Sequence, residues 1–235
     1  MISIVTGTLN RLGMLPTLIQ NTVMSDGRLE LVLVDGGSTD GTIDYIKKLN
    51  HPQIKLIEVG GRSSYPHFMN LGIRAATHEV ICQWNDDVIL CNEWSEVFIE
   101  LQSNHDFYLF NWKYGSYDDT KNPEWLRGVD YLNGWCLCNG ADSGGEIVMN
   151  YGLYSKKIFR EIGMYNPEYQ YYCADGDMSY RAYAFGYKVK DLLHVRVCSL
   201  PVGKVATSHP EDHSIYQRNM NLYRQKILPE SLQYL

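Results

Sequence analysis

The chain has 235 residues, of which 45% are hydrophobic and 20% are charged, and it contains 20 Gly and 8 Pro. This composition is typical of a globular domain, and it excludes disordered, collagen-like and low-complexity proteins. The 21 Lys and Arg residues against 27 Asp and Glu residues give a net charge of −6, so no overall field attracts nucleic acid.

The sequence contains no apolar run that approaches the roughly 18 residues needed to span a bilayer. Met1 to Val5 resembles a strand rather than a leader peptide, so we expect a cytoplasmic protein without a transmembrane segment. The six cysteines are irregularly spaced, which predicts reduced thiols and no structural zinc.

Strands and helices are predicted to alternate over the first half of the chain. Short apolar runs predict strands at 2–5, 29–34, 54–59 and 80–84, and helical spacing of apolar residues predicts helices after residue 11, after residue 42 and over 66–76. Ser38, Thr39 or Asp40 is expected to cap the second helix. The alternation predicts an open, mostly parallel α/β sheet flanked by helices, with ligands at the carboxyl ends of the strands.

The second half of the chain is less regular. The stretch 107–151 is rich in Tyr, Trp, Asn and Gly and has poor periodicity. Helices are predicted at 156–162 and 177–185, a strand at 188–197 and a surface helix at 214–227. Aromatic residues that could stack on sugars, although most such rings belong to cores, are Trp112, Tyr114, Tyr117, Trp125 and Trp135.

Asp35 follows the second predicted strand and begins a glycine-rich loop. A carboxylate at a strand end can accept hydrogen bonds from a ligand N–H, and Gly36 and Gly37 would let that ligand approach closely. An equally favoured alternative is a plain turn in which Ser38 or Asp40 caps the next helix.

Asn85, Asp86 and Asp87 follow the fourth predicted strand. Charges clustered at the end of a hydrophobic strand need a partner. Mg²⁺ or Mn²⁺ bridging to a diphosphate would be such a partner, and we favour it over a solvated acidic loop. A metal-ligand role for His209 or His213 is less favoured, because an isolated His is more often a surface residue.

Asp175 and Asp177 stand at the start of a predicted helix. Carboxylates there often only complement the helix dipole, and the residues alone favour this interpretation. The alternative is that one of them takes a proton from a hydroxyl as a general base.

Taken together, these segments resemble glycosyltransferase family 2, whose members have the GT-A fold. The resemblance runs from residue 3 to about residue 189. It rests on four motifs in the family's order: Thr8 to Arg11, Val34 to Thr42, Met69 to Ala76 leading to Asn85-Asp86-Asp87, and Ile162 to Pro167 followed by Ala174 to Asp177.

The resemblance implies a single GT-A-like domain over 1–235. Its parts would be a Rossmann-like nucleotide-sugar-binding half at 1–105, an acceptor-binding half at 106–200 and a C-terminal extension at 201–235.

The resemblance also implies roles for individual residues. Asp175 would be the general base of an inverting transfer, and Asp87, with Asn85 and His209, would hold Mn²⁺ or Mg²⁺. Asp35 would read the base of the nucleotide. The residues expected to line the nucleotide are Thr6, Thr8, Arg11, Asp35, Gly37, Asn70 and Asp86.

Four residues depart from the family's usual pattern. Leu9 replaces an aromatic residue, Gly36 a second acidic residue, Asn85 the first carboxylate of the acidic triplet and Ala174 a Glu. These departures put nucleotide affinity, metal affinity or rate in question.

The expected function is transfer of a sugar from a nucleotide-diphosphate sugar to a hydroxyl of a carbohydrate or glycoconjugate acceptor. One alternative is a non-catalytic GT-A-like domain that binds carbohydrate or a partner protein. A less favoured alternative is a sugar-1-phosphate nucleotidyltransferase, because Thr6 to Arg11 is a poor version of the basic, glycine-rich loop of such enzymes.

Overall fold

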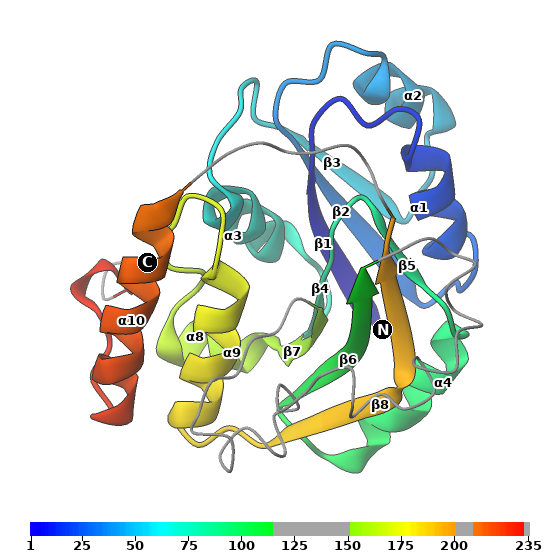
Figure 1. Cartoon of the computed structure of the whole chain (residues 1–235). Helices are drawn as coiled ribbons and strands as arrows, with labels where there is room; N and C mark the ends of the chain where they lie inside the picture. The colour runs from blue at the N-terminus through cyan, green and yellow to red at the C-terminus, as the bar shows by residue number, and fades with distance from the viewer. Residues whose placement is uncertain (115–150, 201–208, 233–235) are drawn as a thin grey trace.

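The computed structural model describes residues 1–114, 151–200 and 209–232, with the side chains of 111–114 and 193 left out. These residues form one eight-stranded sheet in the order β3-β2-β1-β4-β7-β6-β8-β5 (Figure 1). The strands are β1 (Ile2–Thr8), β2 (Leu29–Asp35), β3 (Ile54–Glu58), β4 (Val80–Gln83), β5 (Val88–Leu90), β6 (Phe107–Tyr114), β7 (Gly152–Ser155) and β8 (Val189–Ser199).

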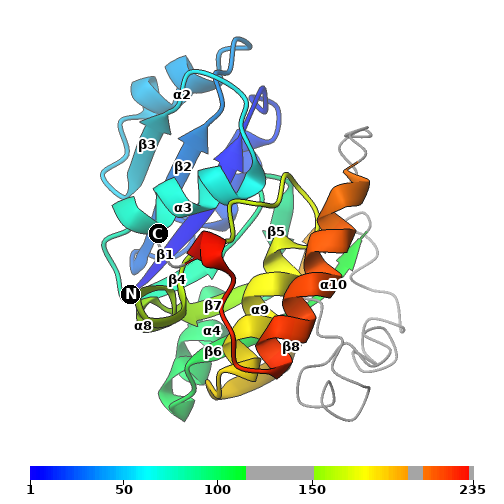
Figure 2. The same ribbon diagram turned by 90° about the vertical axis from the view of Figure 1, so that its left-hand side faces the viewer.

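Helices cover both faces of the sheet, and Figure 2 shows α3, α8, α9 and α10 together on one face. No helix in the described ranges is long and apolar enough to cross a membrane. The α-helices are α1 (Leu15–Asn21), α2 (Thr42–Leu49), α3 (Tyr65–Ala75), α4 (Trp94–Glu100), α8 (Lys156–Ile162), α9 (Ala174–Ala184) and α10 (Pro210–Arg224), and the 3₁₀ turns are η1 (Leu101–Ser103) and η3 (Glu230–Leu232).

Four of the seven strand pairings are parallel, and they include all three that join β3, β2, β1 and β4. Every residue of β2 is buried, as expected for a parallel strand that is covered on both faces. The predicted open, mostly parallel α/β sheet is therefore confirmed, and its parallel part places the carboxyl ends of β1, β2 and β4 at one edge.

Two hydrophobic cores lie on opposite faces of the sheet. Val5 and Val32 face the core under α3, α8, α9 and α10. Their neighbours Ile4 and Leu33 face the core under α1, α2 and α4. This alternation follows from the two-residue period of a strand, and it locks the register of the parallel strands.

The helix predicted at 177–185 begins earlier, at Ala174. Cys173 has a left-handed backbone (φ 63°), and its carbonyl oxygen accepts the first helical hydrogen bond from the Asp177 N–H at 2.8 Å. Asp175 therefore lies in the first turn of α9 rather than in a loop before it.

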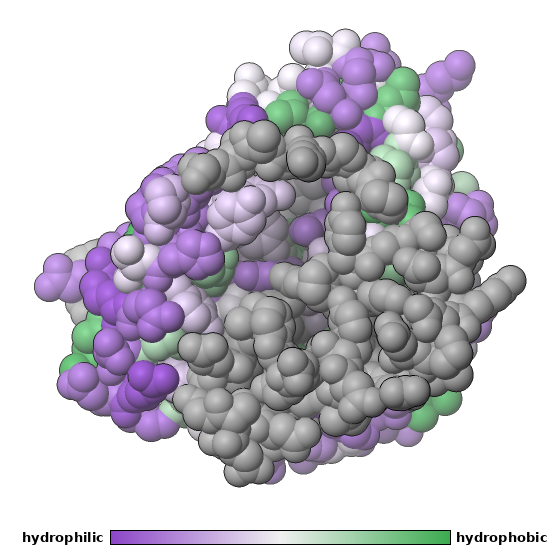
Figure 3. Space-filling view, in the orientation of Figure 1, coloured by the Kyte–Doolittle hydropathy of each residue, from purple (hydrophilic) through white to green (hydrophobic). Residues whose placement is uncertain are grey.

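The helix predicted at 214–227 also begins earlier, at Pro210, where a proline fits the first turn of a helix. Hydrophilic residues gather over its outward face, at the left of Figure 3. The predicted surface helix is therefore present, and its inner face buries Asp212, Tyr216, Asn219, Met220 and Tyr223.

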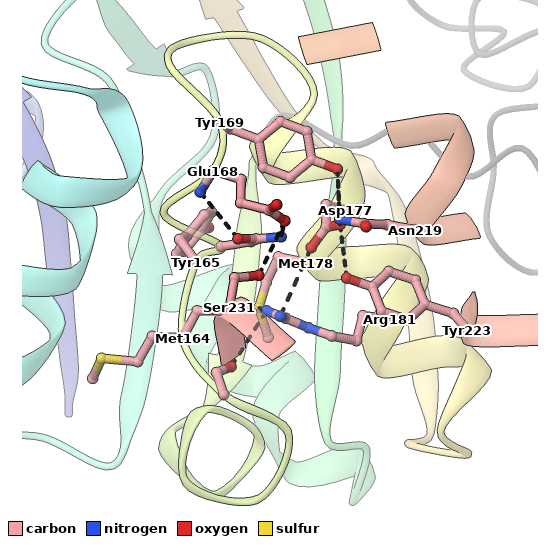
Figure 4. A network of polar contacts seen from close by, with 12 residues as sticks. Met164, Tyr165, Glu168, Tyr169, Asp177, Met178, Arg181, Asn219, Tyr223 and Ser231 are labelled. Carbon is pink, nitrogen blue, oxygen red and sulfur yellow. Dashed lines mark hydrogen bonds and ion pairs between the residues drawn. The ribbon is translucent and has the colours of Figure 1, made fainter. Parts of the chain in front are cut away.

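A buried polar network joins α10 to α9 (Figure 4). Asp177 Oδ1 accepts hydrogen bonds from the Tyr169 hydroxyl (2.9 Å), Asn219 Nδ2 (3.0 Å) and the Tyr223 hydroxyl (2.8 Å). Arg181 Nη1 lies 3.8 Å from the other carboxylate oxygen. Because a buried charge is costly without such partners, this network fixes α10 against the sheet domain.

Gly72 tests how closely α3 approaches the sheet. A Cβ at this position would lie 2.3 Å from Val5 Cγ1 and 3.2 Å from Val34 Cγ2. We therefore expect Gly72→Ala to lower the free energy of unfolding by about 1–3 kcal/mol through overpacking, although Ala is the better helix former. Urea unfolding measures this, with the exposed Arg74→Ala as a control that should change stability by less than about 0.5 kcal/mol. A Gly72→Ala protein as stable as wild type would contradict the close approach.

Candidate active site

The loops after β1, β2 and β4 meet at one edge of the sheet. Thr8 is paired in register with Asp35, and Val5 is paired with Gln83. The strand β4 therefore ends opposite Val5, before β1 ends at Thr8. The loop Asn85 to Asp87 continues in the same direction and brings Asp86 to the Thr8 hydroxyl.

The loops after β1 and β2 are cross-linked by side chains. The Asn10 backbone N–H donates to Ser38 Oγ, and the Thr39 N–H donates to Asn10 Oδ1, both at 2.8 Å. The Leu12 N–H donates to Asp40 Oδ2 at 3.0 Å. These bonds hold the two loops as one rigid unit beside the strand ends.

The predicted N-cap of α2 is wrong. The N-cap residue is Gly41, in the left-handed region (φ 95°), which has no side chain to cap the helix. Ser38 Oγ and Asp40 Oδ2 bond to the β1 loop, and Asp40 Oδ1 accepts the Thr42 N–H at 3.0 Å from the position before the N-cap.

Asp35 is fully buried and shapes its own loop. Its Oδ1 accepts the backbone N–H groups of Gly37 (2.8 Å) and Ser38 (2.7 Å), and its Oδ2 accepts the Ser38 hydroxyl at 2.6 Å. A carboxylate has about four acceptor positions, so Oδ2 keeps capacity for one further donor.

The two glycines of this loop are there for different reasons. Gly37 has φ 90°, and a Cβ would lie 3.0 Å from the Gly60 carbonyl carbon, so only glycine fits. A Cβ on Gly36 would lie 3.1 Å from Phe68 Cζ. The ring of Phe68, from α3, therefore takes the space that a second acidic residue would need.

Asp86 and Asp87 are partly buried carboxylates beside one cation. Arg11 Nε lies 3.6 Å from Asp86 Oδ1. Burial raises the pKa of Asp86 to about 6, and the charge of Asp87 adds to this, whereas Arg11 and the nearby Thr8 hydroxyl lower it. Burial also raises the pKa of Asp87. One Arg against two carboxylates leaves negative charge uncompensated, and a divalent cation would balance it.

The described part of the chain contains no group of three or more His, Cys, Asp or Glu side chains placed to hold a metal ion. His209 Nδ1 lies 3.3 Å from Glu211 Oε1, and Asn85 Nδ2 donates to the Tyr151 hydroxyl at 3.1 Å. The structure thus gives both of these predicted ligands other partners. Asp86 and Asp87 alone fit the one or two carboxylates that a protein supplies to a cation bound mainly by a diphosphate.

Tyr151 links the two sides of the site. Its hydroxyl lies 3.1 Å from both Asn85 Nδ2 and Ser199 Oγ. Burial raises the pKa of its phenol, and the charges of Asp87 and Asp175 raise it further, so this ring lies within electrostatic reach of both carboxylates. Sequence reasoning missed Tyr151, because it ends the irregular aromatic stretch and belongs to no motif.

Asp175 is a partly exposed carboxylate in the first turn of α9. Its Oδ1 accepts the Gly176 N–H at 2.9 Å. Burial raises the pKa of Asp175 to about 6, and the Gly176 N–H limits that increase. At neutral pH the group is ionised and more basic than an ordinary Asp, which suits proton abstraction. Asp177, by contrast, belongs to the buried network under α10.

Two predicted nucleotide-binding side chains are occupied within the fold. The hydroxyl of the buried Thr6 donates to the Gly7 carbonyl oxygen at 3.0 Å. The Asn70 amide makes two hydrogen bonds to the Tyr165 backbone, donating to its carbonyl oxygen at 2.8 Å and accepting its N–H at 2.9 Å. These contacts explain both side chains without a ligand.

Tyr117, Trp125 and Trp135 lie outside the described residues, as do the side chains of Trp112 and Tyr114.

Comparison with known proteins gives the family. The profile described as Glycosyl transferase family 2 matches residues 3–163. No curated protein matches the chain significantly.

Solved structures give the fold. The chain is similar to Staphylococcus aureus TarS 1–349 in complex with UDP-GlcNAc, with a TM-score of 0.73 and 16% identity over 98% of this chain and 68% of that one. It is also similar to the mannosyltransferase PcManGT from Pyrobaculum calidifontis in complex with GDP-Man and Mn²⁺, with a TM-score of 0.67 and 14% identity over 94% of this chain and 69% of that one. The chain spans 40% of a longer S. aureus TarS structure.

The family profile covers more than half of the chain, and the fold of the chain matches that of these glycosyltransferases. The chain therefore belongs to glycosyltransferase family 2 and has the GT-A fold, as the sequence resemblance predicted.

Proposed function

We propose that this protein transfers a sugar from a nucleotide-diphosphate sugar to a hydroxyl group of a carbohydrate or glycoconjugate acceptor, with inversion at the anomeric carbon. One observation carries the proposal. Burial raises the pKa values of two carboxylates, Asp87 and Asp175, and the negative charges of both raise the pKa of the Tyr151 phenol. The Tyr151 hydroxyl accepts a hydrogen bond from Asn85 Nδ2 at the carboxyl edge of the sheet. One of the two carboxylates can serve the leaving group and the other the attacking group.

The nucleotide would bind beside the loops after β1 and β2. Arg11 is the cation next to the acidic pair and would face the diphosphate. Asp35 Oδ2 has one acceptor position left for an N–H of a base, and because Asp35 is fully buried, the loop Gly36 to Ser38 would have to shift to admit it. The nucleotide sugars in the TarS and PcManGT structures support this assignment.

Asp87, with Asp86, would hold Mn²⁺ or Mg²⁺, and the Mn²⁺ in the PcManGT structure supports this. A bound divalent cation stabilises the negative charge that develops on a leaving diphosphate. For this purpose the protein would supply the acidic pair, with Arg11 beside it.

Asp175 would act as the general base. Its carboxylate takes the proton of the acceptor hydroxyl while that oxygen forms a bond to the anomeric carbon. The bond from this carbon to the diphosphate oxygen breaks on the opposite face, so the configuration inverts. The dipole of α9 favours the ionised form of Asp175 before the reaction.

Asp175→Asn tests the base. The variant keeps the shape of the side chain but cannot accept the proton, so we expect the transfer rate to fall at least about 100-fold. Nucleoside diphosphate release from UDP-GlcNAc and GDP-mannose measures the rate, and nucleotide affinity should stay unchanged as a control. A rate close to wild type would remove Asp175 from this role.

The raised pKa of Asp175 predicts opposite pH dependences for rate and stability. The base is ionised only above its pKa of about 6, so the rate should fall as the pH drops through that value. Between the unfolded and folded pKa values the native state holds the extra proton, so wild type loses stability as the pH rises through this window, and Asp175→Asn does not. Urea unfolding should therefore show the variant gaining on wild type between about pH 4 and about pH 6, with no further change above that range. A difference independent of pH would contradict the raised pKa.

Asp87→Ala tests the metal side. Removing one of two carboxylates should abolish the part of nucleotide affinity that depends on Mn²⁺ and leave metal-free affinity unchanged. Calorimetric titration with UDP and GDP, each with and without Mn²⁺, measures this. Asp44→Ala, which removes an exposed carboxylate from α2, is the matched control. If Asp87→Ala keeps the wild-type response to Mn²⁺, Asp87 is not a ligand.

A further inference from the structure

Tyr171 and Tyr172 form an exposed aromatic pair on the loop that leads into α9. Each is 40% exposed, and the other large exposed hydrophobic residues in the described ranges are Met or Ile. The two rings meet edge to face, with centroids 5.0 Å apart and an interplanar angle of 89°. Adjacent exposed aromatic rings that the fold holds in place offer apolar contact area and polar hydroxyls to a ligand, which makes this pair a candidate binding surface.

The backbone beneath these rings is fixed by one buried carboxylate. Asp212, fully buried on α10, accepts three consecutive backbone N–H groups, those of Gln170 (2.8 Å), Tyr171 (2.8 Å) and Tyr172 (2.7 Å). Charge-assisted hydrogen bonds of this kind are stronger than neutral ones. The loop is therefore rigid although its side chains face solvent.

Two further contacts hold the same loop from either side. The Gln170 carbonyl oxygen accepts the Tyr65 N–H of α3 at 2.9 Å. The Tyr172 ring stacks on His213 of α10, with centroids 6.3 Å apart and an interplanar angle of 11°. Figure 1 shows the loop between α3 and α10. A rigid aromatic surface loses little conformational entropy when it binds a ligand.

The order of residues in the chain and the electrostatics of Tyr171 both place the aromatic pair near the candidate active site. Tyr172 is followed by Cys173, Ala174 and then Asp175, the proposed base. On the other side, the charges of Asp87 and Asp86 raise the pKa of Tyr171 after the larger effect of burial, so this ring lies near the acidic pair. The pair therefore lies just before the proposed base in the chain and within electrostatic reach of the proposed metal carboxylates.

We propose that Tyr171 and Tyr172 are the platform on which the acceptor sugar stacks, and that Asp212 is the positioning residue for this platform. The inference rests on the proposed function, since it names the acceptor subsite of the same centre. Sugars present flat C–H faces that pack on aromatic rings, while their hydroxyls at the rim stay free to meet a base such as Asp175. The ligand class is a pyranose ring at the end of a carbohydrate or glycoconjugate.

This assignment makes α10 part of the active site. The family profile ends at residue 163, and sequence analysis expected only an extension after residue 200. Through Asp212 and His213, α10 instead holds the acceptor side of the site in place.

The test uses the full chain and an array of immobilised hexoses, N-acetylhexosamines and their disaccharides, in the presence of Mn²⁺ and UDP or GDP. We expect Tyr171→Ala and Tyr172→Ala to bind the carbohydrate that wild type selects roughly three- to tenfold more weakly. The matched controls Tyr171→Phe and Tyr172→Phe keep the ring and should stay within about twofold of wild type. Nucleotide affinity should be the same in all four variants.

Asp212→Asn tests the positioning role. It should weaken carbohydrate binding and speed hydrogen exchange at the amides of 170–172, again with unchanged nucleotide affinity. The two Tyr→Ala variants change exposed side chains, so they test the platform even if Asp212→Asn does not fold.

Carbohydrate binding by both Tyr→Ala variants at wild-type strength would overturn the platform, and so would a wild-type protein that binds nucleotide but no carbohydrate of the array. A wild-type protein that binds neither UDP nor GDP would instead overturn the proposed function. Failure of the platform and failure of the proposed function therefore give different results.

Discussion

The cost of taking a carboxylate out of water organises this molecule. A buried carboxylate must find donors or cations, or else its pKa rises. Asp35 and Asp212 each accept three hydrogen bonds at short distance, and they fix the loops on either side of the site. Asp87 and Asp175 have weaker compensation and raised pKa values. The satisfied carboxylates therefore fix the loops, and the under-compensated ones are those to which we assign the chemistry.

This division also explains why α10, which the sequence analysis treated as a surface helix, matters to the site. The Asp177 network seats α10 on α9, and the seated α10 then offers Asp212 to the loop before α9. Asp175 follows that loop directly, so its position depends on contacts that begin more than 30 residues later in the chain. The site is assembled from both halves of the fold, with Tyr151 between them.

Much of the fold could be predicted from the sequence, because the signals are local. A nearly continuous apolar run such as Leu29 to Val34 indicates burial on both faces, and helical spacing such as that of Pro66 to Ala76 indicates burial on one face. The start of α9 could not be predicted, because it depends on the left-handed backbone of Cys173. The prediction of the N-cap of α2 was wrong because Ser38 and Asp40 form hydrogen bonds to the loop after β1. Rules based on neighbouring residues do not include such a contact.

Sequence motifs point to the carboxylates of the candidate site but not to their partners. Asp87 and Asp175 stand in motifs, whereas Tyr151 and Asp212 become meaningful only once distant strands and helices meet. Asn70 illustrates the converse, since a motif position turned out to hold the Tyr165 backbone. Sequence motifs thus locate the edge of the sheet, and tertiary contacts decide which side chains there are free to act.

The most direct test of the central claim is thermal unfolding of the wild-type chain with UDP, GDP, dTDP and CDP, each with and without Mn²⁺. A ligand that binds only the native state adds RT ln(1 + [L]/Kd), about 2.7 kcal/mol at about 100 times its Kd. A strand-edge site for a nucleotide-diphosphate sugar requires one of these nucleotides to stabilise the fold, and to do so more strongly with Mn²⁺. Absence of stabilisation by all four, with and without the metal, would contradict the account.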